Sequence, residues 1–173
     1  VLDRSERLLK EIAEEDSPNQ IKALEYLLRI FEQEREWERA TEVAEKLVAK
    51  GKSLQTQLSH YYCALAEQNL KVGDFVHARQ DLKKALQTDK RCVRASLMLA
   101  DVESQADNAR EAVKSLKRVL EQDPAFIPDT LPQLRKNHET LNQLGELSSY
   151  LFECLEKSPA ISIVIELSEL VTQ

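Results

Sequence analysis

A pattern that returns every 34 to 38 residues constrains the fold of this chain more than any other feature. Each copy holds a leucine followed by a small or apolar residue, then a polar turn, and then an alanine. A fixed period of this length is typical of solenoid proteins, in which each repeat is one supersecondary unit. The three clearest copies contain Leu27-Leu28 with Ala40, Leu65-Ala66 with Ala78, and Leu99-Ala100 with Ala112.

Each copy is predicted to be a pair of amphipathic helices. In the second copy, apolar and small residues recur at i, i+3, i+4 and i+7 on both sides of a short turn, as expected for helices with one buried face. Gly73 is suited to ending the first helix and Asp74 to capping the second. The two stripes are Tyr62, Leu65, Ala66 and Asn69, followed by Phe75, Ala78, Leu82 and Ala85.

The composition agrees with a chain made only of helices. Glycine and proline together contribute 8 of 173 residues, too few for the frequent turns of a β-sandwich or barrel. Hydrophobic residues make up 42% of the chain, which is enough for a core and argues against disorder. The alanines at the helix crossings allow two helices to approach closely. The predicted fold class is therefore all-α.

The helix pairs resemble the tetratricopeptide repeat, a helix-turn-helix unit of 34 residues. This resemblance implies a right-handed superhelical array of about ten helices that forms a single solenoid over 1–173. Neighbouring repeats then stabilise one another, because no repeat buries its apolar face alone. The expected segments are a lone second helix at 2–17, repeats at 18–52, 55–90 and 92–124, a divergent repeat at 127–158, and a lone first helix at 160–173.

The fourth repeat departs from the pattern. Arg135 stands at the small position of its first helix, and Leu147 replaces the central alanine of its second. Pro128 and Pro132 predict a late or irregular start of the first helix, because proline is tolerated only in the first turn. The lone helices at the two ends have unpaired apolar faces, which favours a homodimer or a further segment of a longer protein.

No arrangement of residues predicts catalysis or metal binding. The phosphate-binding, nucleophile-elbow and zinc-protease motifs are absent from the sequence,. The three histidines are isolated from one another in the repeat frame. Cys63, Cys92 and Cys154 are too scattered for a disulfide framework or a zinc site, so we expect them to be buried. The prediction is a protein that is not an enzyme and holds no cofactor in this segment.

Charge and hydropathy exclude two further classes of partner. The net charge of −6 repels phosphate backbones, so nucleic acid is not an expected partner. No run of 18 apolar residues is present, so this segment is not expected to insert into a membrane.

The expected site is the concave groove that the first helices of the repeats would line. Residues beside the buried stripe should face it, and their mixture of charged and apolar side chains suits a peptide or a helix of a partner protein. The alternative is that some of them pair with one another across helices, for example Glu67 with Arg94. The candidate groove residues are Lys22, Glu25, Tyr26, Arg29, His60, Cys63, Glu67, Arg94, Leu97, Met98 and Asp101.

Several stretches resemble a narrower family than the generic repeat. They are similar to the cytoplasmic repeat region of the lipopolysaccharide assembly protein B family (LapB, also called YciM) of Gram-negative bacteria. The most specific stretch is 59–66, because generic repeats require neither His60 nor Cys63. The resemblance runs from about Leu2 to Leu170, and its other main stretches are 23–31, 36–40, 43–48 and 112–120.

This resemblance implies a regulatory adaptor on the cytoplasmic side of the inner membrane. Members of the family have an N-terminal membrane anchor and a C-terminal rubredoxin-like metal module, and both would lie outside this segment. They work with the membrane protease FtsH to control the deacetylase LpxC, which catalyses the committed step of lipid A synthesis. The predicted function is therefore a non-catalytic scaffold in lipopolysaccharide biosynthesis.

Two other functions remain open from the residues alone. One is a generic peptide-binding module, and the other is the accessory repeat domain of a glycosyltransferase. The clamp that grips acidic C-termini of chaperones is disfavoured, because it needs a lysine and asparagine set that converges on one carboxylate. Cys63, Glu67, Leu97 and Asp101 stand at the corresponding positions.

Overall fold

The computed structural model describes residues 2–14 and 18–172. Residues 15–17 of the predicted segment 2–17 and residue 173 of the segment 160–173 lie outside the described residues. The described residues contain ten α-helices, one short 3-10 helix and no strand, as the sequence predicts. The chain divides into two compact units, Val1–Asp89 and Lys90–Gln173, called here the N-terminal and C-terminal units.

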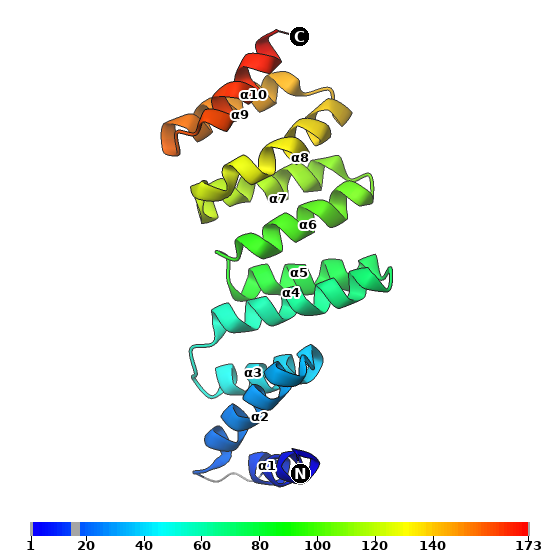
Figure 1. The fold of residues 1–173 in the computed structure, drawn as a ribbon, viewed down its shortest axis with the longest axis vertical. Coiled ribbons are helices and arrows are strands. Elements are labelled where there is room, and N and C mark those ends of the chain that lie inside the picture. Colours follow the sequence, from blue (N-terminus) through cyan, green and yellow to red (C-terminus); the bar gives the residue numbers. More distant parts are fainter. Residues whose placement is uncertain (1, 15–17, 173) are drawn as a thin grey trace. The chain divides into compact units, whose positions relative to one another are not determined.

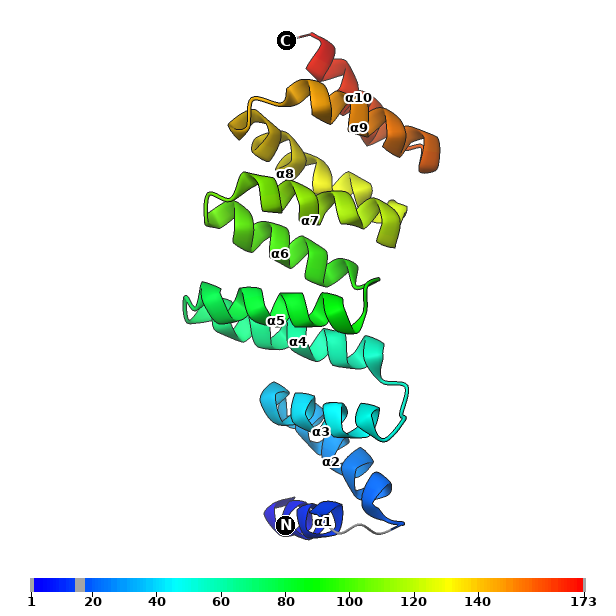
Figure 2. The same cartoon turned by 180° about the vertical axis from the view of Figure 1, so that it is seen from behind.

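The N-terminal unit consists of one lone helix followed by two helix pairs. The paired helices α4 and α5 run side by side in opposite views (Figure 1, Figure 2). The Trp37 ring stacks on the Tyr61 ring with centroids 6.1 Å apart, and the Tyr61 hydroxyl donates a hydrogen bond to Glu32. These contacts join three successive helices. The helices of this unit are α1 (Leu2–Glu14), α2 (Gln20–Glu34), α3 (Trp37–Ala49), α4 (Gln55–Lys71) and α5 (Phe75–Thr88).

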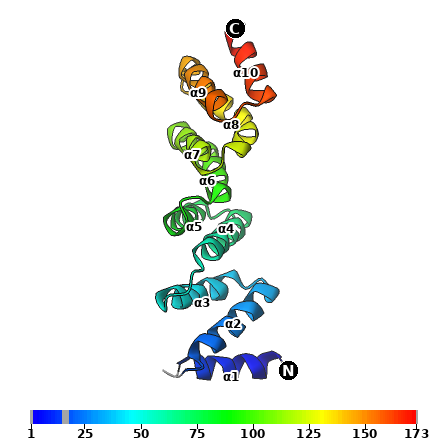
Figure 3. The same ribbon diagram turned by 90° about the vertical axis from the view of Figure 1, so that its left-hand side faces the viewer.

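The C-terminal unit has two further helix pairs and a final helix. Seen from the side, α6, α8 and α10 form one layer of this unit, and α7 and α9 form the other (Figure 3). The unit contains α6 (Val93–Gln105), α7 (Ala109–Gln122), the 3-10 helix η1 (Pro124–Phe126), α8 (Ile127–Thr140), α9 (Leu144–Lys157) and α10 (Ile161–Val171).

The turn between α4 and α5 forms as its residues predict. Gly73 has φ +79°, a left-handed conformation that glycine adopts without a steric penalty,. The Asp74 carboxylate then accepts a hydrogen bond of 3.0 Å from the backbone N–H of His77. This bond satisfies one of the N–H groups that the first turn of α5 leaves without a partner.

The alanines at the helix crossings have no exposed surface. Each is the contact point at which a larger side chain would separate two packed helices. The cysteines are also buried, as predicted,. The fully buried alanines at repeat positions are Ala40, Ala66, Ala78, Ala100 and Ala112.

The first helix of the divergent repeat has an irregular start but not a late one. η1 leads directly into α8, which begins at Ile127. Pro128 lies in the first turn, where its missing N–H costs nothing, but Pro132 lies inside the helix,. Because proline has no N–H, the carbonyl of Pro128 loses its usual donor four residues on. The helix nevertheless continues to Thr140, because Ile127, Leu131 and Leu134 are buried in the core.

Arg135 explains how a repeat without the small residue still packs. Its guanidinium lies 3.1 Å from Glu166 and 2.6 Å from Glu169, both on α10, and 3.2 Å from Glu139 on its own helix. In this repeat the ion pairs of Arg135 with α10 take the place of the close helix contact that an alanine would allow. On α9, Leu147 is fully buried at the position of the alanine.

Candidate partner-binding surfaces

The predicted groove residues of the N-terminal unit lie on α2 and α4. Five of them are exposed, and Glu25 is half-buried. Tyr26 is 57% exposed, a large value for an aromatic ring, and the Arg29 guanidinium lies 6.0 Å from its centroid. Lys52 forms an ion pair of 2.7 Å with Glu25. The exposed residues of this set are Lys22, Tyr26, Arg29, His60 and Glu67.

The prediction is wrong for Cys63, whose side chain is fully buried. Helix α4 packs against both α3 and α5, so most of its circumference is covered. His60 and Glu67, seven residues apart, remain on the narrow exposed face of this helix. Cys63 therefore belongs to the core of the unit and not to a surface that a partner contacts.

In the C-terminal unit, the predicted residues lie on α6 and are partly tied to their own unit. Leu97 is half-buried against the hydrophobic core. Asp101 is exposed and accepts a hydrogen bond from the Gln133 amide of α8. Beside this pair, the Ser104 hydroxyl donates a 3.1 Å hydrogen bond to the side-chain Oδ1 of Asn137. Two side-chain contacts thus link α6 to α8, while Arg94 and Met98 are half-buried.

The N-terminal unit has a second concave surface, which the sequence did not predict and which we call the acidic groove. It has a volume of about 500 Å³. Walls come from α3 and α5, and α4 supplies the floor with Tyr62 and Leu65. One feature of the sequence could have indicated this groove: the α3 carboxylates are spaced at i, i+4 and i+7, which places them on one helix face. The charged lining residues are Glu38, Glu42, Glu45, His77, Asp81 and Lys84.

Hydrogen bonds fix two of the carboxylates of the acidic groove. The Tyr62 hydroxyl donates to Glu45, and the Asn69 amide donates to Asp81 over 2.9 Å. Burial raises the pKa of Asp81, and it also raises the pKa of Tyr62, with the Glu45 carboxylate acting in the same direction. Tyr62 thus stays neutral and remains a hydrogen-bond donor.

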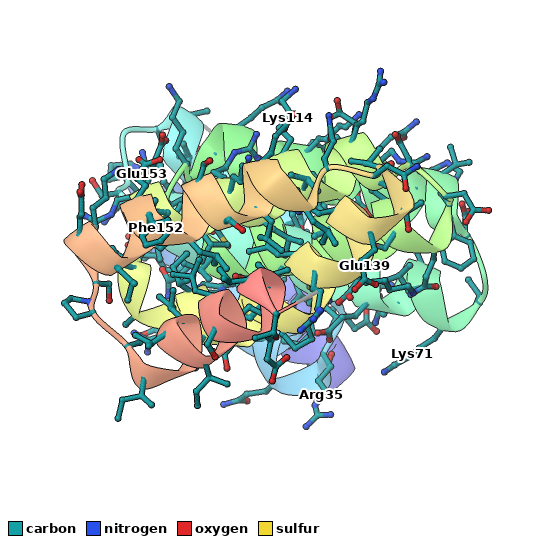
Figure 4. The ribbon with its side chains drawn as sticks, turned by 90° about the horizontal axis from the view of Figure 1, so that it is seen from above. Arg35, Lys71, Lys114, Glu139, Phe152 and Glu153 are labelled. Atoms are coloured by element: carbon teal, nitrogen blue, oxygen red, sulfur yellow. The ribbon has the colours of Figure 1, made fainter. Side chains whose placement is uncertain are left out.

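A pocket of about 490 Å³ lies between α7 and α9 of the C-terminal unit. Tyr150 is among its lining residues, and the Lys117 ammonium lies 5.0 Å from that ring. Lys157 pairs with Glu153 at 2.7 Å. Phe152 and Glu153 are labelled on α9 in Figure 4, and of these two only Glu153 lines the pocket. Three carboxylates and two lysines line this pocket, so its charges nearly balance.

His138 is a buried histidine of α8 whose ring is hydrogen-bonded to the backbone of its own helix. Its Nδ1 lies 2.7 Å from the carbonyl oxygen of Leu134, which makes Nδ1–H the donor. Burial lowers the pKa of His138 below its ordinary value, and nearby Lys117 acts in the same direction. The histidine is therefore held neutral in the folded chain.

We predict that acid destabilises the C-terminal unit through His138. The unfolded chain binds a proton near pH 6.5 and the folded chain only at lower pH, so stability falls as the pH drops below about 6.5. For each pH unit by which the pKa of the folded state lies below that of the unfolded state, the free energy of unfolding falls by about 1.4 kcal/mol at low pH. Thermal melts at pH 7.5 and 5.5 should show a smaller loss of Tm for His138→Asn, which keeps a donor near Leu134. An equal loss in both proteins would contradict this role.

Two kinds of feature do not occur among the described residues. No three side chains of histidine, cysteine, aspartate or glutamate converge as ligands for a metal ion. Within the same part of the chain, no helix combines the length and the apolar character needed to cross a membrane.

Comparisons with known proteins place the chain among the repeat proteins. The tetratricopeptide repeat model matches residues 69–129. The N-terminal domain of stress-induced protein-1 from C. elegans superposes with a TM-score of 0.58 at 17% identity, covering 69% of this chain and 99% of that one. This structural similarity concerns the fold alone.

The proteins that are similar in sequence point to a narrower group than the repeat fold does. Lipopolysaccharide assembly protein B of Escherichia coli K12 is 32% identical over 170 residues, which cover 98% of this chain and 43% of that protein. The Haemophilus influenzae Rd protein of the same name is 38% identical over 130 residues, covering 75% of this chain and 33% of that protein. The chain thus spans less than half the length of these relatives. It contains tetratricopeptide-type repeats and is similar over nearly its whole length to a segment of lipopolysaccharide assembly protein B.

Proposed function

We propose that this chain is a non-catalytic protein-interaction module in lipopolysaccharide assembly. The observation that carries the proposal is the 32% identity with lipopolysaccharide assembly protein B over 98% of the chain. The fold supports it, because packed helix pairs offer rigid surfaces that stay fixed when a partner binds.

The finer proposal is an adaptor that links the membrane protease FtsH to the deacetylase LpxC. The two proteins would meet on the cytoplasmic side of the inner membrane, where the whole protein would be anchored. Such an adaptor contributes effective concentration, since two partners held on one scaffold meet far more often than free molecules. The exposed residues of α2 and α4 in the N-terminal unit offer one surface for such contacts. Tyr26 is the strongest candidate anchor, because aromatic residues dominate the energy of protein interfaces.

Binding to purified LpxC and to purified FtsH tests this proposal. The chain is immobilised, and each protein is titrated over it in biolayer interferometry. We expect saturable binding of at least one of them, and the double variant Tyr26→Ala with His60→Ala should weaken it about tenfold. Both residues are exposed, so the melting temperature should not change.

Glu14→Gln, an exposed position on α1, is the control and should bind like the unaltered chain. If neither protein binds at concentrations up to about 100 μM, where a contact would be worth only about 5 kcal/mol, the adaptor proposal is wrong for this segment. Equal binding by the double variant would remove Tyr26 and His60 from the contact surface.

A further inference from the structure

The acidic groove has an excess of negative charge that its own residues do not neutralise. Four carboxylates line it, against one lysine and one histidine. We propose that the acidic groove binds a lysine- or arginine-rich segment of a partner protein. This inference rests on the proposed role as an interaction module, but it does not depend on which proteins are the partners.

The floor of the groove already holds a cation. The Lys84 ammonium lies 5.6 Å from the centroid of the Tyr62 ring. An aromatic face attracts a cation at this distance through its quadrupole. Lys84 therefore occupies the place that a side chain of the partner would take, and it can leave because the residue is exposed.

The carboxylates around that floor are arranged to receive a cation. Glu45 and Asp81 are held by Tyr62 and Asn69, so little side-chain freedom is lost when a guanidinium arrives. Glu38 and Glu42 stand one turn apart on α3, and both are exposed. A planar guanidinium bonds to a carboxylate through two parallel N–H groups, which makes arginine the better fit.

The pocket of the C-terminal unit lacks a comparable excess of negative charge. Its three carboxylates face two lysines, so it has no comparable attraction for a cationic segment. An anionic ligand is disfavoured in the acidic groove, because four carboxylates repel it.

A defined peptide tests the proposal. The probe is a fluorescein-labelled octapeptide of alternating arginine and serine, and its glutamate and serine counterpart serves as the negative probe. Anisotropy is measured with the whole chain at about 0.1 M salt, where charges beyond about 10 Å are screened. We expect binding of the arginine peptide only, weakened about five- to tenfold by Glu38→Gln with Glu42→Gln.

The matched control removes the same charge elsewhere in the N-terminal unit. Glu14→Gln with Glu34→Gln changes two exposed carboxylates outside the groove. This variant should bind the arginine peptide within about twofold of the unaltered chain. An equal loss in both double variants would mean that only net charge matters, and the proposal would be wrong.

Lys84 supplies a test of opposite sign. Lys84→Met vacates the Tyr62 ring and should tighten binding about threefold or more. Lys83→Met removes the same charge from the neighbouring exposed position and should have a clearly smaller effect. Equal tightening, or no binding of the arginine peptide by any variant, would overturn the proposal. A chain that binds the peptide but neither FtsH nor LpxC would keep this inference and lose the adaptor proposal.

Discussion

Truncation of Leu147 to alanine is expected to destabilise the C-terminal unit by about 2–5 kcal/mol. Leu147 is fully buried, and it lies in a hydrophobic core with Leu116, Leu134, Leu151 and Ile163. Removing its branched end loses apolar contact and leaves a cavity that packed helices fill only in part. Urea unfolding followed by circular dichroism measures the loss as a lower midpoint of the transition that belongs to this unit.

Phe152→Ala is the control on the same helix. It removes a larger side chain, but Phe152 is 59% exposed, so the expected change is below about 1 kcal/mol. If Leu147→Ala were as mild as Phe152→Ala, the position would not be a core position, and the placement of α9 would be wrong.

Enlarging Ala78 to leucine is expected to destabilise the N-terminal unit by about 1–3 kcal/mol. Ala78 lies on α5 with no exposed surface, and α5 packs closely on α4. Three extra heavy atoms have no space there, so the two helices must separate or the side chain must leave its preferred rotamer. A thermal melt should show a lower Tm for the transition that belongs to the N-terminal unit, with little change in the C-terminal unit.

The control adds the same side chain at a position without neighbours to displace. Gln80→Leu changes an exposed residue of α5, and we expect its effect to stay within about 0.5 kcal/mol. An unchanged Tm for Ala78→Leu would contradict the repeat register, because that register requires a small residue at this crossing.

The repeat period predicts most of the fold, because it reports packing between neighbouring helices. The alanines recur at crossings where only a small residue fits, and the structure buries each one. Gly73 and Asp74 predict the turn without any knowledge of the tertiary fold. One left-handed residue is enough to end a helix, and one side-chain acceptor is enough to start the next. Such features depend on neighbours within a few residues, so the sequence alone reveals them.

Features that depend on two or three helices at once could not be predicted in this way. Cys63 lies beside the buried stripe of α4 on a helical wheel, but its side chain is fully buried in a helix that packs against both α3 and α5. The acidic groove needs carboxylates from α3 and α5 around Tyr62 of α4, which are up to 43 residues apart. Pro132 was expected to disturb the start of α8, yet the burial of Leu131 and Leu134 outweighs one lost hydrogen bond.

The contacts of Arg135 make the attachment of α10 within the C-terminal unit depend on ionic strength. Its carboxylates reach that guanidinium across the helix interface, and Glu169 is more than half exposed. Simple salts screen such a contact, whereas they do not screen the burial of Ile163 and Leu167,. Local opening of α10, seen as amide hydrogen exchange, should thus become faster in salt while the exchange of α7 does not.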